Sequence, residues 1–322
     1  MAKNDSTPIR ERVVFYSGCD AVVGEIFIPR GLAEGERRAA VVLAPGYVAT
    51  KEMPYGQAED LTLEGYVALA FDYRGSPGAS KLWGADNPPG VIRIYPEECV
   101  RDIRAAVTYL STRKEVIPDR IGLIGGSAGG SYVVPAAAAE PRVKCVISEG
   151  GIGDGYRWAR LARGSWQFRE YIRKIEDDKV KKVLTGVSEV IPTTEFMQFN
   201  PSEIDSWVTF SKFFPKMAQL ELMVPLEACE AWLEFKPELV VDKISPRAIL
   251  FICQEVSDIV PPEEVPLFYE KAKEPKKLVV VPASIVPTRY AKFRLDQGAR
   301  YIPWIWNHMM EWFREYLPAR TT

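Results

Sequence analysis

Histidine is almost absent from this chain of 322 residues, because His308 is the single one. One histidine excludes any mechanism that needs two, and it excludes a histidine-rich metal site. The five cysteines are an odd number at wide spacings, and no two of them form a C-x-x-C pair. A disulfide framework and a cysteine-rich zinc site are therefore not expected, and this usage favours a reducing, cytoplasmic compartment.

Features of membrane and nucleic-acid proteins are also missing. No run of about 18 apolar residues occurs, and residues 1–8 lack the apolar stretch of a signal peptide. The formal net charge is −2 and the basic residues are scattered, so we expect no attraction to nucleic acid or to an anionic membrane. The sequence contains no phosphate loop and no dinucleotide fingerprint, so we expect no cofactor. The expected partner is a small-molecule substrate, and a homodimer is left open.

The first half of the chain alternates short apolar runs with segments of helix length. Continuous apolar strands followed by helices are typical of a parallel sheet that is covered on both faces. An opening hairpin is expected before them, with strands near 13–15 and 22–27. The fold class is therefore α/β, with a doubly wound and mostly parallel sheet. The expected strands span residues 39–43, 66–71, 120–124 and 144–148, and an amphipathic helix spans 96–112.

This alternation stops at about residue 154 and resumes at about residue 243. The stretch between has helical periodicity over 171–184 and 220–235, and it contains too many aromatic residues for a disordered linker. We therefore expect a core made of residues 1–153 and 243–322, interrupted by a helical insertion of residues 154–242. The second part of the core contains expected strands at 248–253 and 278–281 and a helix from about 303 to 316.

The most specific motif is Gly125-Gly126-Ser127-Ala128-Gly129, which fits the nucleophile-elbow pattern G-x-S-x-G. It follows the expected strand at 120–124 and opens an alanine-rich segment at 131–139. In such a turn the serine hydroxyl lies at a helix N-terminus, where free N–H groups and the helix dipole favour developing negative charge. The alternative is a glycine-rich turn without catalysis.

With this motif the chain resembles the α/β-hydrolase superfamily, and it is most similar to dienelactone-hydrolase-like and peptidase-like members with a helical lid. The resemblance implies that Ser127 is the nucleophile and that the insertion forms a lid over it. Residues 45–52 resemble the family's oxyanion loop, which implies an oxyanion hole made by the backbone N–H groups of Tyr47 and Ala128. The Tyr47 side chain itself is equally consistent with a core aromatic beneath the loop.

The resemblance also implies a catalytic acid but leaves the base open. Asp258 lies in a turn that matches the family's D-x-V-P pattern, and Glu255 is the weaker candidate. Where the family has histidine, this chain has Val286, or Ile285 with a one-residue slip, and neither side chain can accept a proton. His308 is either a displaced base or a packed residue in the second turn of the terminal helix. Whether the missing histidine is natural or engineered is left open.

The insertion contributes aromatic residues that could line a pocket, although most such residues pack inside a lid. Three arginines, Arg157, Arg160 and Arg163, favour a solvated helix face over carboxylate recognition. The leading hypothesis is a serine hydrolase that cleaves an ester, thioester, amide or activated C–C bond of an apolar or aromatic substrate. The alternatives are a lyase, cyclase or isomerase without a histidine base, and a non-catalytic binding protein. The aromatic residues are Trp158, Trp166, Phe168, Tyr171, Phe196, Phe199, Trp207, Phe210, Phe213 and Phe214.

Overall fold

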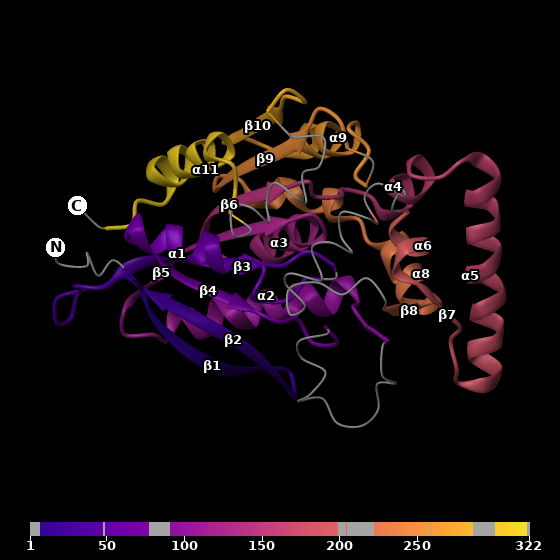
Figure 1. The fold of residues 1–322 in the computed structure, drawn as a ribbon, viewed down its shortest axis with the longest axis horizontal. Helices are drawn as coiled ribbons and strands as arrows, with labels where there is room; N and C mark the ends of the chain where they lie inside the picture. The colour runs from indigo at the N-terminus through magenta and orange to yellow at the C-terminus, as the bar shows by residue number, and fades with distance from the viewer. Residues whose placement is uncertain are drawn as a thin grey trace.

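The computed structural model describes residues 7–47, 49–76, 91–198, 204, 222–257, 259–285 and 300–320. Within these residues an eight-stranded sheet has the order β1-β2-β4-β3-β5-β6-β9-β10 (Figure 1). β2 runs antiparallel to both of its neighbours, and the strands from β4 to β10 are parallel to one another. The strands are β1 Ile9–Ser17, β2 Asp20–Ile28, β3 Arg38–Ala44, β4 Val67–Phe71, β5 Val116–Gly126, β6 Val143–Glu149, β9 Ala248–Gln254 and β10 Lys276–Val281.

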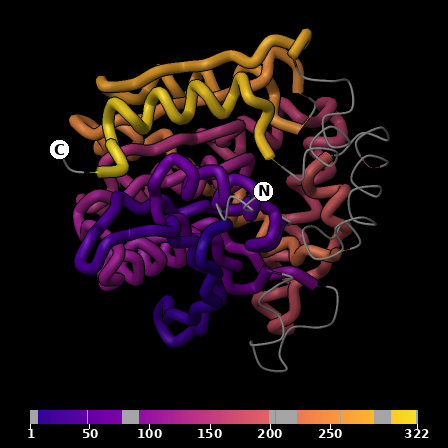
Figure 2. The backbone as a smooth tube through the Cα atoms, turned by 60° about the vertical axis from the view of Figure 1, so that its left-hand side comes forward, coloured from indigo at the N-terminus to yellow at the C-terminus, as the bar shows by residue number. Residues whose placement is uncertain are grey.

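Helices cover both faces of this sheet. Because successive side chains of a strand point to opposite faces, Val41 joins the core under α1 and α11, whereas Val42 joins the core under α2, α3 and α9. Figures 1 and 2 show the yellow helix α11 along the orange C-terminal strands, in agreement with its contacts to β9. The helices are α1 Tyr55–Leu63, α2 Pro96–Ser111, α3 Ala128–Ala139, α9 Glu264–Lys271 and α11 Pro303–Tyr316.

Most of the elements between β6 and β9 gather at one end of the sheet, and both chain termini lie at the opposite end (Figure 1). The long helix α5 forms the outer edge of the molecule there. β7 and β8 pair as a short antiparallel ribbon beside it. These elements are α4 Gly155–Leu161, α5 Ser165–Thr185, β7 Val190–Pro192, α6 Thr193–Met197, β8 Met223–Pro225, α8 Leu226–Glu234 and the 3-10 helices Pro237–Leu239 and Val241–Ile244.

The expected α/β class and mostly parallel sheet are confirmed, and the eight strands of this sheet differ from expectation only at their ends. The short strands β7 and β8 were not expected, because the insertion was interpreted as helical.

Three helices begin elsewhere. The helix expected over 171–184 starts earlier, at Ser165. The helix after the elbow starts at Ala128 and not at residue 131, because its glycines carry too little apolar pattern to mark its first turn. The helix expected over 220–235 starts at Leu226. Pro225 disfavours helical backbone at the residue before it, and that residue belongs to β8.

Two kinds of feature are absent from the described residues. None of their helices is both long enough and apolar enough to cross a membrane. They also contain no group of three or more histidine, cysteine, aspartate or glutamate side chains that could hold a metal ion.

Candidate active site

Ser127 has a strained backbone at the carboxyl end of β5. It is the N-cap residue of α3, with φ 54° and ψ −125°, and its side chain is half-buried. A positive φ at a non-glycine residue costs about 1–3 kcal/mol and persists only where the surroundings enforce it. The Ser127 N–H donates to the Glu149 carbonyl oxygen at 2.7 Å, and the Gly130 N–H donates to the Ser127 carbonyl oxygen at 2.9 Å. The strand–turn–helix context predicted for the motif is therefore the one in which Ser127 lies.

Close backbone approach explains the glycines on either side of Ser127. A Cβ on Gly125 would lie 2.2 Å from the Gly129 carbonyl oxygen, and a Cβ on Gly129 would lie 2.2 Å from the carbonyl oxygen of Ala44. Any side chain at either position would collide with backbone. The first turn of α3 is thus pressed against the end of β3 and against its own preceding strand. This packing holds the turn in the conformation that Ser127 needs.

The loop after β3 passes directly beside the serine. A Cβ on Gly46 would lie 3.5 Å from the Ser127 Cβ. Within the described part of the chain, the N–H of Tyr47 has no backbone acceptor, and the N–H of Ala128 belongs to the first turn of α3, where N–H groups lack an intrahelical acceptor. The structure therefore places Gly46 beside Ser127, and the two residues predicted for the oxyanion hole, Tyr47 and Ala128, are their chain neighbours.

The side chain of Tyr47 is a core aromatic. It is 2% exposed, and its ring centroid lies 5.0 Å from that of Phe196 and 6.2 Å from that of Trp232. Its buried hydroxyl has no hydrogen-bond partner among the described residues, and burial raises the pKa of Tyr47 well above its ordinary value. The ring fixes the loop against α6 and α8, while the backbone N–H is the group relevant to an oxyanion.

An ion pair anchors the other side of this loop. The Lys51 N–H and ammonium donate to the two carboxylate oxygens of Asp72, each at 2.8 Å. The Asp72 side chain is fully buried just beyond β4. Burial raises the pKa of Asp72 even though Lys51 acts in the opposite direction. The aspartate therefore serves the loop as a structural anchor.

The predicted acid, Asp258, lies outside the described residues, and so do its contacts. Its neighbour Ile259 accepts a hydrogen bond from Trp158 Nε1 at 2.8 Å, so helix α4 holds the turn in place. The weaker candidate, Glu255, is exposed and accepts the Ala283 N–H at 2.8 Å. This contact joins the loops that follow β9 and β10.

His308 lies in α11, on the sheet face opposite α3. The helix runs from the carboxyl edge of the sheet to the amino edge, where the Tyr66 hydroxyl donates to the Leu317 carbonyl oxygen at 2.9 Å. At 1.5 Å per residue, His308 lies about 8 Å along it. Its ring centroid is 4.4 Å from that of Trp304, and its Nδ1 is 3.6 Å from Glu311 Oε2. The described contacts do not join His308 to Ser127.

The position where the family has histidine is described only in part. Val286 lies outside the described residues. Ile285 is half-buried and packs with the core under α11, and its N–H donates to the Pro282 carbonyl oxygen at 2.9 Å.

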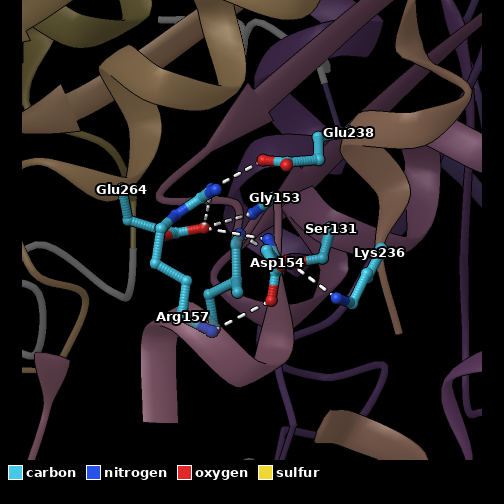
Figure 3. Close-up of polar contacts among 8 residues, drawn as sticks. Ser131, Gly153, Asp154, Arg157, Lys236, Glu238 and Glu264 are labelled. Atoms are coloured by element: carbon cyan, nitrogen blue, oxygen red, sulfur yellow. Dashed lines mark hydrogen bonds and ion pairs between the residues drawn. The ribbon is translucent and has the colours of Figure 1, made fainter. Parts of the chain in front are cut away.

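A buried charge network joins both ends of the insertion to α9. Glu264 is fully buried and accepts the N–H groups of Gly153 and Asp154, each at 2.9 Å. Figure 3 shows Arg157 between two carboxylates, with Nε 2.7 Å from Glu264 Oε2 and an Nη 2.6 Å from Glu238 Oε2. The interpretation of a solvated arginine face was therefore wrong for Arg157.

The other two arginines differ from each other. Arg163 is 6% exposed, donates to the Phe196 carbonyl oxygen at 2.7 Å and lies over the Tyr171 ring, so it too departs from a solvated face. Arg160 is exposed. Arg157 and Arg163 are thus occupied by protein groups, and only Arg160 fits the expected solvated helix face.

Most of the described aromatic residues of the insertion pack inside it. Trp158, Phe168, Tyr171 and Phe196 are each at most 6% exposed, whereas Trp166 is 63% exposed. Phe199, Trp207, Phe210, Phe213 and Phe214 lie outside the described residues.

Sequence reasoning missed one polar pair beside the elbow. The Tyr301 hydroxyl donates to Glu149 Oε2 at 2.6 Å, and a Cβ on Gly126 would lie 3.3 Å from that same oxygen. Glu149 could have been noticed as an acidic residue at the end of an apolar strand. Tyr301 carried no such signal, because it lies 152 positions away along the chain.

The chain is similar to known proteins over part of its sequence. The model of the prolyl oligopeptidase family matches residues 56–202. An uncharacterized 31.7 kDa protein of Escherichia coli is 25% identical over 66% of this chain and 70% of its own length. The 2,6-dihydropseudooxynicotine hydrolase of Paenarthrobacter nicotinovorans is 32% identical over 44% of this chain and 36% of its own.

Solved structures share the whole architecture. The α/β hydrolase GrgF from Penicillium sp. sh18 superimposes with a TM-score of 0.72, at 17% identity, over 96% of this chain and 99% of its own. The chain therefore has the α/β-hydrolase fold and is similar to members of that superfamily. These likenesses support an enzyme with hydrolase activity.

Proposed function

We propose that the protein is a serine hydrolase that uses Ser127 as its nucleophile. The observation that carries this proposal is the backbone of Ser127, which is held at φ 54° by glycine packing on both sides. A non-catalytic serine gains nothing from this strained conformation, whereas a nucleophile gains an exposed hydroxyl beside free N–H groups. The residues of the G-x-S-x-G motif and the arrangement of the loop at Gly46 and Tyr47 support the same function.

The proposed reaction is acyl transfer to Ser127 followed by hydrolysis. The serine oxygen attacks the carbonyl carbon while its proton passes to a base, and the N–H groups of Tyr47 and Ala128 stabilise the oxyanion. The leaving group takes the proton as the intermediate collapses, and water then releases the acyl group by the reverse sequence. In this scheme Asp258 stabilises the charged base, and His308 is the base that the sequence offers.

We propose that the substrate is a small apolar or aromatic molecule with an ester, thioester, amide or activated C–C bond. The aromatic content of residues 154–242, taken as a lid, supports an apolar pocket. The name of the relative from Paenarthrobacter supports a small molecule. The buried rings of Trp158 and Phe196 pack inside the proposed lid. We therefore assign substrate specificity to other residues of the lid.

The test is hydrolysis of p-nitrophenyl esters of graded acyl length by wild type, Ser127→Ala and Ser165→Ala. Ser165 is an exposed serine at the start of α5 and serves as the matched control. We expect turnover that falls by up to about 10⁶-fold in Ser127→Ala and is unchanged in Ser165→Ala. Turnover retained in Ser127→Ala would contradict the proposal.

A second candidate is a lyase, cyclase or isomerase on the same scaffold, or a binding protein. Val286 favours it, because it stands where the family has its histidine base. In such an enzyme the oxyanion hole would stabilise an enolate, and Asp258 would move the proton. This candidate expects no ester turnover and ligand binding that survives Ser127→Ala.

A further inference from the structure

An open groove of about 550 Å³ crosses the outer face of α2. Small-molecule sites typically have volumes of about 300–1,000 Å³. The walls of the groove are residues 15–18 of the opening hairpin, one face of α2 from Arg101 to Thr112, and Glu140 with Arg142 after α3. None of these residues belongs to the elbow or to the loop after β3, so the groove is separate from the candidate active site.

The hairpin side of the groove is held in place by a buried contact. The Arg74 guanidinium donates to the Ser17 carbonyl oxygen at 2.9 Å and to Asp102 Oδ1 at 2.8 Å. Asp102 is fully buried in α2. The turn after β1 and the helix are therefore fixed to each other, and the groove between them is a built feature of the fold.

Two arginines in the groove have no carboxylate partner. Arg101 and Arg104 are three positions apart on α2, so their side chains are neighbours one turn apart on the same helix face. Both are exposed and line the groove. Within the described part of the chain, neither side chain forms an ion pair or donates a hydrogen bond. Glu98, one turn earlier, attracts Arg101 only at longer range.

The third arginine of the groove is already neutralised. Arg142 Nε lies 2.9 Å from Glu140 Oε1, and an Nη lies 2.8 Å from Glu140 Oε2. The two Nη groups also donate to the hydroxyl oxygens of Ser111 and Thr108, at 2.9 Å and 2.8 Å. Arg142 therefore forms a rigid wall. The charges of Arg101 and Arg104 remain unbalanced in the groove, although the whole chain has a formal net charge of −2.

Aromatic rings lie beside these charges. The Tyr109 ring stacks on the buried Phe15 ring, with centroids 5.3 Å apart and an interplanar angle of 18°. Tyr16, the next residue along β1, lines the groove and is 69% exposed. The groove thus combines two free guanidinium groups with an accessible flat ring.

We propose that this groove binds a small phosphate monoester that carries a planar ring. Arg101 and Arg104 bind the phosphate oxygens, and Tyr16 contacts the ring. Guanidinium groups bind phosphate through paired N–H donors. A phosphate monoester carries about −1.5 to −2 charge at pH 7, which matches the two unbalanced arginines, whereas a carboxylate matches only one of them. This inference goes beyond the proposed reaction at Ser127 and does not depend on it.

The experiment is isothermal titration calorimetry of the full chain with phenyl phosphate, inorganic phosphate and benzoate at constant ionic strength. Phenyl phosphate has no carbonyl carbon, so it is not a substrate of the proposed acyl transfer. The proteins are wild type, Arg101→Gln, Arg104→Gln, Tyr16→Ala and the control Arg169→Gln. Arg169 is an exposed arginine of α5 that also has no ion pair among the described residues. All four side chains are exposed, so we expect every variant to fold, and the thermal midpoint checks this.

We expect wild type to bind phenyl phosphate about 10-fold more tightly than benzoate, because the second arginine has no partner in a carboxylate complex. Arg101→Gln and Arg104→Gln should each weaken phenyl phosphate binding about 10-fold, since each removes charge-assisted hydrogen bonds. Tyr16→Ala should weaken phenyl phosphate about 3-fold and leave inorganic phosphate unchanged. Arg169→Gln should match wild type with every ligand.

Several results would overturn the proposal. If wild type shows no saturable binding of phenyl phosphate, the groove is not such a site. If Arg101→Gln and Arg104→Gln bind phenyl phosphate like wild type, the ligand lies elsewhere on the protein. Benzoate binding as tight as that of phenyl phosphate would refute the phosphate chemistry, and inorganic phosphate binding as tight would refute recognition of the ring. None of these results would change the case for Ser127.

Discussion

The sequence offers His308 as a candidate base for Ser127, yet the local structures around these two residues differ in kind. Ser127 has a positive φ. A Cβ added to Gly125 or Gly129, on either side of it, would collide with backbone atoms. α11 is an amphipathic helix that begins at Pro303 and buries Ile305, Met309 and Phe313 against the sheet. His308 occupies an ordinary position in that helix.

The difference shows where the sequence is constrained by something other than stability. A helix histidine against a tryptophan needs no functional explanation, because aromatic pairs stabilise helices by themselves. A strained serine in so tightly packed a turn needs a functional explanation, because a relaxed turn would be more stable. Local strain therefore supports the proposed role of Ser127 more strongly than the presence of a single histidine supports a role for His308.

Among the variants, we expect Gly129→Ala at the elbow to have the largest effect on stability. The new Cβ would lie 2.2 Å from the Ala44 carbonyl oxygen, and backbone cannot yield as a side chain does. We expect a loss of about 4 kcal/mol in the free energy of unfolding, or no folded protein. Urea titration measures it. Gly46→Ala is the control, since its nearest contacts are 3.5 Å and its cost should be below about 1 kcal/mol. Equal costs would show that the turn is not tightly packed.

A smaller effect is expected at the root of the insertion. Glu264→Gln leaves Arg157 without its fully buried partner, so we expect a loss of about 3 kcal/mol. Glu311→Gln on α11 is the matched control. It removes the exposed partner of His308 and should leave the thermal midpoint unchanged. If the thermal midpoint moved equally in both variants, the buried Glu264–Arg157 pair would matter no more for stability than the exposed contact on α11. That result would contradict the account.

The smallest effect is a gain in stability. Tyr47→Phe removes a buried hydroxyl that has no described hydrogen-bond partner and keeps the ring against Phe196 and Trp232. We expect an increase of about 1 kcal/mol in the free energy of unfolding, with ester turnover unchanged because the oxyanion donor is the backbone. Calorimetry and the ester assay together measure both. A fall in turnover would assign the hydroxyl a role in the reaction.

The fold was largely predictable from the sequence because its strands are continuous apolar runs. The runs at 39–43 and 248–253 coincide with buried strands in which almost no side chain is exposed. Such strands leave little doubt about a sheet that is covered on both faces. The hairpin of β1 and β2 was predicted from two apolar runs in the same way, and the terminal helix from Pro303 as a first-turn residue.

The candidate site was predictable only where it is local. Ser127, Ala128 and Gly129 form one motif, so their geometry follows from five consecutive residues. The contact between Glu149 and Tyr301 joins β6 to the segment before α11, and no periodicity marks it. The role of Arg157 depends on Glu264, 107 positions away, which made a solvated face the natural expectation. Pairing across the fold is set by tertiary packing, which a single sequence does not display.

The most direct measurement of the central claim is the site of covalent modification. Wild-type protein treated with an alkyl fluorophosphonate would be digested, and the adduct located by peptide mass spectrometry. We expect one adduct, on Ser127, that is absent from Ser127→Ala. An adduct on a different residue, or an unmodified Ser127 after prolonged treatment, would contradict the claim that the strained turn is the catalytic centre.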